Sequence, residues 1–523
     1  MGKKADKKAA KKAAKMEAKR LNPALRFPAR TMPRMAFDGA DLNRRTYGWN
    51  AVSTNSDAEY RMSGARLRDV SREMVRNKPY ATRAKNAIVS NTIGGGIIPS
   101  IKADKAKRLK ARLEDKLSEV ADTTAIDADG KLDLYGMQAL VMKCVFESGE
   151  AIVRMRPRTR FRDDKLPMPF QLQVLEPDYL DASIDGQLPN GNVAVQGIEF
   201  DKIGRAVAYH LFQQHPGANG FTVRTDSSAV PAEFIAHVYR VDRPGQARGI
   251  PWLHSVMMRL NDLHDFLDAQ LIRQKIAACF VGFVTGEDSM TEIGDLESNT
   301  TDNGTVEEIF EPGMMRYLKN GQDVKFGVPP PVTDFESYLR GTLREIASGL
   351  GVSYEALTGD MSTVNFASGR MGWLEFQRNI DTWRSEMLIP QFCHRVARWF
   401  FDGAAIMGLV TPSDRVKMIW TPPRREMISP RDEVPYIGEA IRNGLTTRSE
   451  ELRKRGYDPE KVDQENAEDN ARADALGLKF DSDARYRSDA GLAISDEKPK
   501  TNDNGLTDGG SGGGDPQSSK TLN

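Results

Sequence analysis

The residues best suited to chemistry are six histidines, and their spacing does not match a catalytic or metal-binding motif. None of them belongs to an HExxH pattern or stands at the spacing of a zinc site. His254 and His264 fall on different faces of one predicted helix. A metal site that combines His264 with Asp262 or Asp265 is an alternative, but solvated or helix-packing roles are favoured for both histidines.

The three cysteines also argue against covalent catalysis. Cys144, Cys279 and Cys393 are far apart and form no CxxC pair, which indicates reduced, buried thiols in an intracellular protein. Cys393 and His394 are direct neighbours, a poor arrangement for a nucleophile and its base. The chain contains neither a GxxxxGK[ST] phosphate loop nor a GxSxG elbow, and the glycines at 94–96 predict a helix stop. We therefore predict no enzyme, cofactor or metal. A hydrolase or nuclease with a carboxylate site assembled from scattered residues is the alternative.

Length and charge narrow the class of protein further. The 523 residues leave room for two to four domains. A net charge of +1 differs from the large basic excess of proteins that grip nucleic acid strongly. The charge is nevertheless polarised, with nine Lys/Arg and two acids in residues 1–20, and fifteen acids and eight bases in residues 458–523. The Lys/Ala arm is interpreted as a solvated segment or as a contact for nucleic acid or an acidic partner. No stretch is apolar enough to cross a membrane.

The first half of the chain predicts an α+β body of about 200 residues. Helical patterns cover 63–93, with a break at 77–79, and then 104–120 and 134–148. Alternating apolar residues and intervening turn signals predict strands at 151–156, 170–177, 197–201, 206–213 and 233–241.

A long helix follows the stretch RPGQARGIPWL at 243–253. Residues 252–281 contain neither Gly nor Pro and predict an uninterrupted helix of roughly 45 Å. Gly249 allows a sharp turn before the helix, and Pro251 suits its first turn. An acidic ridge, Asp262, Asp265 and Asp268, marks one side. The other side carries a narrow apolar stripe of Leu253, Val256 or Met257, Leu260, Leu263, Leu267 and Leu271, whose near-heptad spacing fits a seam between helices.

The second half contains a partner for this helix. A second helix is predicted at 333–350, and a small β-containing insert separates the two. The polar stretch 351–370 is too long for a simple connector. A second long helix spans 367–402 with a kink expected at Pro390. A small helical module covers 429–470, with Thr446 or Thr447 as an N-cap. Two slender helices can bury such stripes only against copies of themselves or a partner, and repeating one such contact around an axis closes a ring.

Six segments in order resemble the portal protein family of tailed bacteriophages, specifically its lambda-like branch. Taken together they span roughly residues 35–470: SREMVRNKPYATRAKNAIVSNTIGGGI (71–97), RPGQARGIPWL (243–253), SGLGVSYEALTGD (348–360), FASGRMGWLEF (366–376), LIPQF (388–392) and GEAIRNGLTTRSEELRKRGYDPEKV (438–462).

The resemblance implies a helix-rich α+β portal fold and a dodecameric ring at one capsid vertex, through which DNA is packaged and ejected. It assigns the segments as follows: a basic flexible arm (1–35), a wing (36–250), a first stem helix (251–281), a clip (282–332), a second stem helix (333–350), a tunnel loop (351–368), a long kinked helix with the wing return (369–424), a crown (425–480) and a disordered tail (481–523).

The resemblance also implies partners and sites. The partners are the large terminase subunit, head-tail connector proteins, the major capsid or scaffolding protein, and duplex DNA passing through. The protein would be found in the virion, and in the host cytoplasm during assembly. Arg248, Gly249 and Pro251 form the wing–stem corner, and the acidic ridge faces the channel. Arg316, Lys319 and Lys325 form the clip surface for partners. The tunnel loop presents Met361, Ser362, Thr363, Val364, Asn365 and Phe366 to DNA. A structural adaptor without a channel is the remaining alternative.

Overall fold

The computed structural model describes residues 8–12, 44, 48, 53–103, 107–218, 226–278, 282–285, 299–300, 306–307, 323–326, 334–362, 364–411, 414–423, 427, 429–480 and 485. The contacts divide the chain into two units, Met1–Glu59 and Tyr60–Asn523, and the second contains the core. Most of the predicted arm (1–35), insert (282–332) and tail (481–523) lies outside the described residues.

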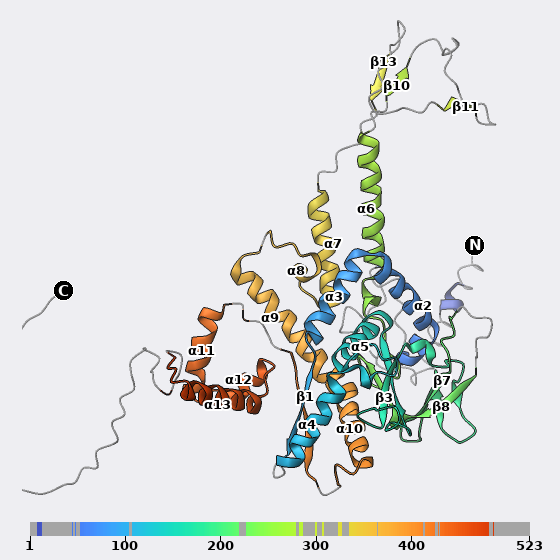
Figure 1. Cartoon of the computed structure of the whole chain (residues 1–523). Coiled ribbons are helices and arrows are strands. Elements are labelled where there is room, and N and C mark those ends of the chain that lie inside the picture. The colour runs from blue at the N-terminus through green and yellow to red at the C-terminus, as the bar shows by residue number, and fades with distance from the viewer. Residues whose placement is uncertain are drawn as a thin grey trace, which may run out of the picture. The chain divides into compact units, whose positions relative to one another are not determined.

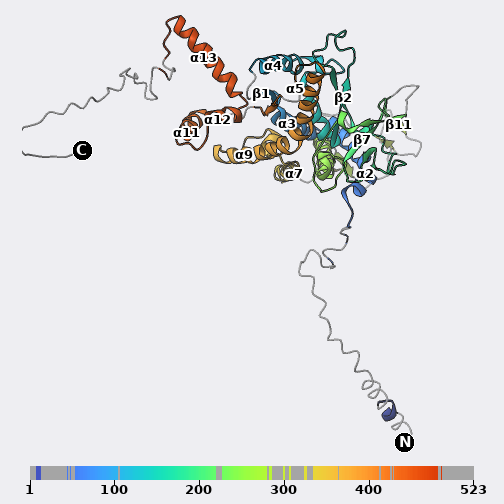
Figure 2. The same cartoon turned by 90° about the horizontal axis from the view of Figure 1, so that it is seen from below.

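Four helices open the fold: α2 (Ser56–Asn77), α3 (Pro79–Ile93), α4 (Lys107–Ala121) and α5 (Leu134–Ser148). Pro79 separates α2 from α3 because proline is tolerated in a first turn but not within a helix. Gly94, with φ 52°, ends α3, which confirms the predicted helix stop. The bounds of α5 agree with the prediction; Asp133 caps its start, and the left-handed Gly149 ends it. In both Figure 1 and Figure 2, α4 lies close to strand β1 (Ile98–Ala103).

Two antiparallel sheets follow. The first has the order β3-β2-β9, from β3 (Phe170–Leu175), β2 (Glu150–Pro157) and β9 (Ile235–Tyr239). The second has the order β4-β5-β6-β7-β8, from β4 (Gly186–Gln187), β5 (Val193–Val195), β6 (Ile198–Phe200), β7 (Ala206–Phe212) and β8 (Ser227–Pro231). Alternate residues of β2 face opposite ways, so Val153 packs in the main core with α5 while Ile152 packs in a second core between the sheets.

The long helix predicted at 252–281 is interrupted. Residues Trp252–Ser255 form a 3-10 turn, Val256 is a turn residue with φ −117°, and α6 covers Met257–Ala278. The prediction of an unbroken helix from residue 252 was therefore wrong. The tighter turn places the Trp252 ring against Phe146 and Trp383, with ring centroids 6.1 and 4.8 Å away. The second helix, α7 (Phe335–Leu350), begins two residues after the predicted start.

The remaining helices follow α7 in the second half of the chain. The predicted polar stretch after α7 contains a short helix, α8 (Tyr354–Thr358). The long helix is α9 (Phe366–Thr382), an 11-residue π-helical segment (Trp383–Cys393) and α10 (His394–Ile406). Pro390 lies within the π-helical segment, where its missing N–H falls among wider turns. Strand β14 (Val416–Thr421) pairs with β1, and α11 (Pro430–Arg442), α12 (Arg448–Lys454) and α13 (Pro459–Ala475) form the last module. Thr447 caps α12.

These elements confirm a helix-rich α+β fold. Within the insert, the described backbone forms two short antiparallel pairs: β10 (Gly282–Thr285) with β13 (Asp323–Phe326), and β11 (Asn299–Thr300) with β12 (Val306–Glu307). The described helices include none with the length and apolar character of a membrane span.

Candidate functional site

Helices α6 and α7 lie side by side (Figure 1), joined by aromatic and charged contacts. The Phe266 ring stacks on Phe335 at 5.7 Å between centroids and contacts the Tyr338 ring at 4.8 Å. Nearer the body, the Arg259 guanidinium lies 3.1 Å from the Glu345 carboxylate. The two segments on either side of the insert are thus paired, as the sequence predicted.

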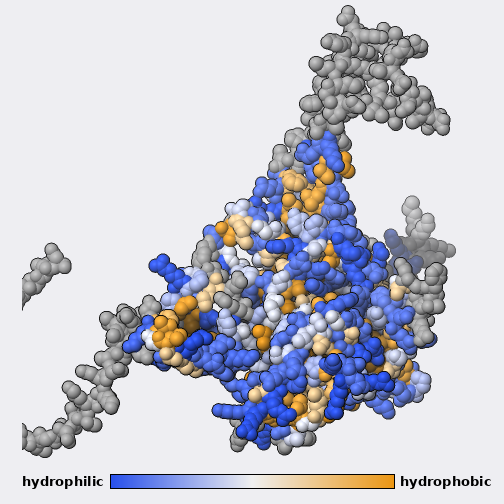
Figure 3. All heavy atoms as spheres, in the orientation of Figure 1, coloured by the Kyte–Doolittle hydropathy of each residue, from blue (hydrophilic) through white to orange (hydrophobic). Residues whose placement is uncertain are grey.

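The apolar stripe of α6 changes its environment along the helix. Residues Leu260 and Leu263 are buried in the main core, and Leu267 packs against it. Leu271 is 53% exposed, its neighbour Ile272 is 56% exposed, and Tyr338 of α7 is half exposed. Figure 3 shows hydrophobic side chains on the surface of this helical pair. The chain therefore covers the first part of the stripe itself and leaves the last part to solvent or to a partner.

The predicted acidic ridge is exposed, and each of its carboxylates has a local partner. Asp262 lies 3.7 Å from Arg259, Asp265 accepts a hydrogen bond from the Asn261 amide at 3.0 Å, and Asp268 lies 3.6 Å from His264. Pairs at this level of exposure contribute little to stability because solvent screens them. The ridge is therefore a hydrated acidic surface on α6.

The predicted corner at Arg248 is built around a buried ion pair. Arg248 is only 2% exposed and donates from Nε and Nη2 to the Glu150 carboxylate, at 2.8 and 2.6 Å. The His237 ring nitrogen Nε2 lies 2.9 Å from the second Glu150 oxygen. The Gly249 amide donates to that same oxygen at 2.9 Å. One fully buried carboxylate thus connects the start of β2, strand β9 and the segment that leads into α6.

The surroundings keep this carboxylate ionised. Burial alone would raise the pKa of Glu150, but the Arg248 guanidinium and the His237 contact hold it well below its ordinary value. The Glu150 charge raises the pKa of Arg248 in spite of its burial. The remaining Arg248 nitrogen, Nη1, donates to the Gln196 carbonyl at 3.1 Å. Both charges are therefore matched by hydrogen bonds, the condition under which a buried pair is tolerated.

The glycine of the corner is required by close packing, which differs from the predicted reason. Gly249 has no left-handed φ. A Cβ atom on it would lie 2.3 Å from the Gly149 carbonyl oxygen and 2.7 Å from the Tyr239 Cβ. Pro251 is buried and precedes the 3-10 turn with φ −53° and ψ 135°, so it lies before the first helical turn. Gln246 bonds the backbone of Asp242 and of Arg248 and fixes the loop internally.

Part of the predicted tunnel loop has a defined structural role. Met361 and Ser362 are exposed, and Val364 is half-buried. Asn365 caps α9, because its side chain accepts from the Ser368 amide while the Ser368 hydroxyl bonds the Asn365 backbone. Thr363 and the side chain of Phe366 lie outside the described residues.

The predicted clip surface is not described. Arg316 and Lys319 lie outside the described residues, and of Lys325 only the backbone is described, paired with Phe283 across β13 and β10. Whether these three cations form one surface is outside the described residues, and their role remains a prediction.

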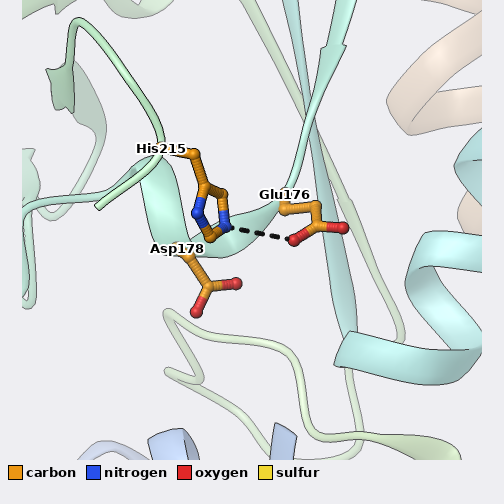
Figure 4. Close-up of side chains that lie close together, drawn as sticks. All are labelled: Glu176, Asp178 and His215. Atoms are coloured by element: carbon orange, nitrogen blue, oxygen red, sulfur yellow. Dashed lines mark ion pairs between the residues drawn. The ribbon is translucent and has the colours of Figure 1, made fainter. Parts of the chain in front are cut away.

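A His–carboxylate cluster that the sequence did not predict joins Glu176, Asp178 and His215 (Figure 4). Their ligand-type atoms lie within 4.8 Å of one another, and His215 Nε2 is 3.3 Å from Glu176. Arg72 of α2, however, pairs with Asp178 and lies 3.2 Å from Glu176. Its hydrogen bond opposes the effect of burial and lowers the pKa of Asp178. Arg72 pairs with both carboxylates, and Arg68 of the same helix lies 3.6 Å from Asp178, so the cluster is an ion-pair junction between α2 and the body.

The two described cysteines have no disulfide partner: Cys393 is buried and Cys144 is half-buried. Burial raises the pKa of both thiols. A raised pKa disfavours the reactive thiolate. The prediction of buried thiols is confirmed at Cys393, whereas Cys144 is half-buried.

Comparison with known proteins identifies the family. The family described as "Phage portal protein, lambda family" matches residues 42–384. The chain is 27% identical to the probable portal protein of Halomonas phage phiHAP-1, covering 86% of this chain and 89% of that one. It is 22% identical to portal protein B of Escherichia phage lambda, covering 88% and 94%. Among solved structures it is similar to the neck of an empty gene transfer agent (GTA) particle, with 15% identity, coverage of 75% and 92%, and a TM-score of 0.43. The family match extends over most of the body, the corner, the paired helices and the loop after them, and the chain belongs to the lambda family of phage portal proteins.

Proposed function

We propose that this portal protein assembles into a closed ring, a dodecamer, whose axis is the channel through which duplex DNA enters and leaves a capsid at one vertex. The supporting observation is the exposed apolar edge of the α6/α7 pair, formed by Leu271, Ile272 and Tyr338. Within the part of the chain that the structure describes, this edge is not covered by a further layer. Identical neighbours that repeat one head-to-tail contact around an axis would cover it in every subunit.

Charge favours a sliding passage in this proposal. Each phosphate that a Lys or Arg neutralises adds a salt-dependent increment to binding, so a basic lining would hold the duplex. The acidic ridge on α6 is hydrated and bears no basic excess. Met361 and Ser362, exposed between α8 and α9, face the channel and touch DNA loosely in this arrangement.

The insert between α6 and α7 is the docking site for partners in this proposal. The large terminase subunit binds there during packaging, and head-tail connector proteins bind after it. The body contacts the capsid or scaffolding protein, and the assembled ring is part of the virion after assembly in the host cytoplasm. Charge reversal at Arg316, Lys319 and Lys325 should reduce packaging by weakening terminase docking, and unchanged packaging would exclude this surface.

Ring assembly is tested by native mass measurement and negative-stain imaging of the purified chain. The wild-type protein should form rings with a central hole. The double variant Leu271→Glu/Ile272→Glu should remain folded but monomeric, because it places charge on an edge that only assembly buries. Gln274→Glu adds charge at an exposed polar position of the same helix and should leave the rings intact. Rings in the double variant would remove the supporting observation.

A further inference from the structure

A run of cations with alternating spacing lies at the far end of strand β2. From 154 to 165 the sequence reads RMRPRTRFRDDK, with six cations and only two carboxylates. We call this segment the basic hairpin: it ends β2 and turns toward β3, and its cations are Arg154, Arg156, Arg158, Arg160, Arg162 and Lys165.

The strand part of the basic hairpin presents Arg154 and Arg156 on one sheet face. Arg154 pairs in register with Gln173 and Ile235, and Arg156 pairs with Gln171. Burial and the field of the neighbouring Arg156 lower the pKa of Arg154. Glu233, the nearest acidic residue before β9, is exposed, and within the part of the chain that the structure describes it forms no ion pair with Arg154 or Arg156.

The turn of the basic hairpin is ordered. The Leu166 amide donates to the Phe161 carbonyl at 2.8 Å, and Lys165 takes a left-handed φ of 53°. The Arg162 guanidinium lies over the Phe161 ring, 5.6 Å from its centroid. At the base, Arg158 Nε donates to the Gln171 amide oxygen at 2.8 Å. The exposed cations Arg160 and Arg162 are therefore displayed on a defined turn, where less ordering entropy is lost on binding.

We propose that the basic hairpin binds the phosphate backbone of duplex DNA. Arginines two residues apart on a strand are about 6.8 Å apart, close to two base-pair steps along one DNA strand. Guanidinium groups bind phosphates in bidentate fashion, and the run uses Arg at five of its six cationic positions. The segment offers no hydrophobic anchor of the kind that protein interfaces bury at their centre, since its one aromatic residue is half-buried under Arg162.

The position of the basic hairpin indicates which DNA it meets. Strand β2 begins at Glu150, in the corner that leads into α6, and runs away from it for eight residues, about 25 Å. The hairpin is thus at the end of the sheet remote from the α6/α7 pair. This step rests on the proposed function, in which the α6/α7 pair (the stem) and the insert (the clip) point out of the capsid. The basic hairpin, at the opposite end of the sheet, then contacts the DNA packed inside the capsid.

The test uses the purified full-length chain and a fluorescent duplex of about 30 base pairs, with binding measured by anisotropy over a range of salt concentrations. The variant Arg156→Gln/Arg160→Gln/Arg162→Gln removes three phosphate contacts. The slope of log K against log salt should become shallower by about 2.7, which corresponds to a loss of nearly three decades of affinity at about 100 mM salt if affinities are equal at about 1 M. Circular dichroism and the thermal midpoint confirm that the variant is folded.

The matched control, Arg66→Gln/Arg76→Gln/Lys202→Gln, removes the same charge from scattered exposed positions. Both proteins keep the Lys/Ala arm, so their difference isolates the basic hairpin. Equal slopes for variant and control would overturn the proposal. Displacement of the DNA by poly-glutamate at equal charge concentration would also overturn it, because the surface would then be a dock for acidic protein. Ring formation is scored separately: DNA binding without rings contradicts only the proposed function, and rings with equal slopes contradict only this inference.

Discussion

Replacing Glu150 with glutamine should loosen the corner that leads into α6. The change keeps the shape of the side chain and removes its charge, leaving Arg248, only 2% exposed, without a counter-ion. Breaking a buried pair in this way costs about 3–5 kcal/mol. The Gly249 amide also loses a charged acceptor, since it donates to the same carboxylate. At the lower bound, local opening becomes more frequent by about a hundredfold.

Hydrogen exchange at neutral pH measures this opening directly. The peptide that covers residues 247–253 should exchange about a hundred times faster in Glu150→Gln than in the wild-type protein. Glu345→Gln is the control, because the Arg259–Glu345 pair lies on the surface with both side chains more than half exposed. Such pairs contribute at most about 1 kcal/mol. Exchange of this peptide within threefold of wild type in Glu150→Gln would refute the idea that the buried pair fixes the corner.

The pH dependence provides a second readout. The folded-state pKa of Glu150 lies below its ordinary value of 4.5, so its contribution to stability is fully present above that value. The contribution is lost as the pH falls through the folded-state pKa, because the unfolded chain then binds the proton more readily. Wild-type exchange at the corner should accelerate as the pH drops below about 4.5, after correction for intrinsic rates, and Glu150→Gln should show a weaker acceleration.

Two further substitutions test other parts of the same structure. Gly249→Ala should destabilise the chain by about 1–3 kcal/mol, since the new methyl would lie 2.3 Å from the Gly149 carbonyl oxygen. Gly341→Ala is in a helical position with open space around it and should instead stabilise α7 by about 0.5–1 kcal/mol. The thermal midpoints of the two variants are compared with that of the wild type. Equal shifts in the two variants would contradict the packing argument. Asn365→Ala should cost about 1 kcal/mol through loss of the α9 cap and should speed limited proteolysis between α8 and α9. Unchanged cleavage would mean that the cap does not hold this loop.

The local sequence pattern was sufficient to predict the bounds of elements that have an apolar run between clear start and stop signals. Helix α5 could be predicted to the residue, because its apolar run lies between an Asp cap and a left-handed glycine. The pair β1–β14 was missed, since its two strands are more than 300 residues apart and β1 begins directly after a helix stop. Sequence periodicity reports which face is apolar, and it carries no information on a pairing partner this distant.

The corner shows the same limit at the level of single residues. The sequence predicted that Arg248 and Gly249 form this corner. It assigned Gly249 to a sharp turn and gave Arg248 no counter-ion. The sequence could not connect Glu150 and His237 to Arg248 and Gly249. The groups that hydrogen-bond the Glu150 carboxylate come from a separate strand and from the loop before α6. A single acidic residue directly after the left-handed Gly149, at the start of a strand whose next three residues are apolar, was the available signal. A buried carboxylate requires a cation, and Arg248 in a segment rich in turn residues was a candidate.

The two halves of the α6 stripe separate folding from assembly. Leu260 and Leu263 contribute to the core of the chain itself, so the start of α6 is held before any neighbour arrives. Leu271 and Ile272 remain more than half exposed after folding, so more than half of their hydrophobic burial is left for association. Because just over half of each side chain is still exposed, burying the remainder of both is worth about 2–3 kcal/mol per subunit contact. A closed ring makes this contact once per subunit, so a modest edge can drive assembly of a subunit that is already folded. The buried Glu150–Arg248 pair fixes where α6 leaves the body. It therefore also fixes where the exposed edge at Leu271 and Ile272 of one subunit meets the next subunit.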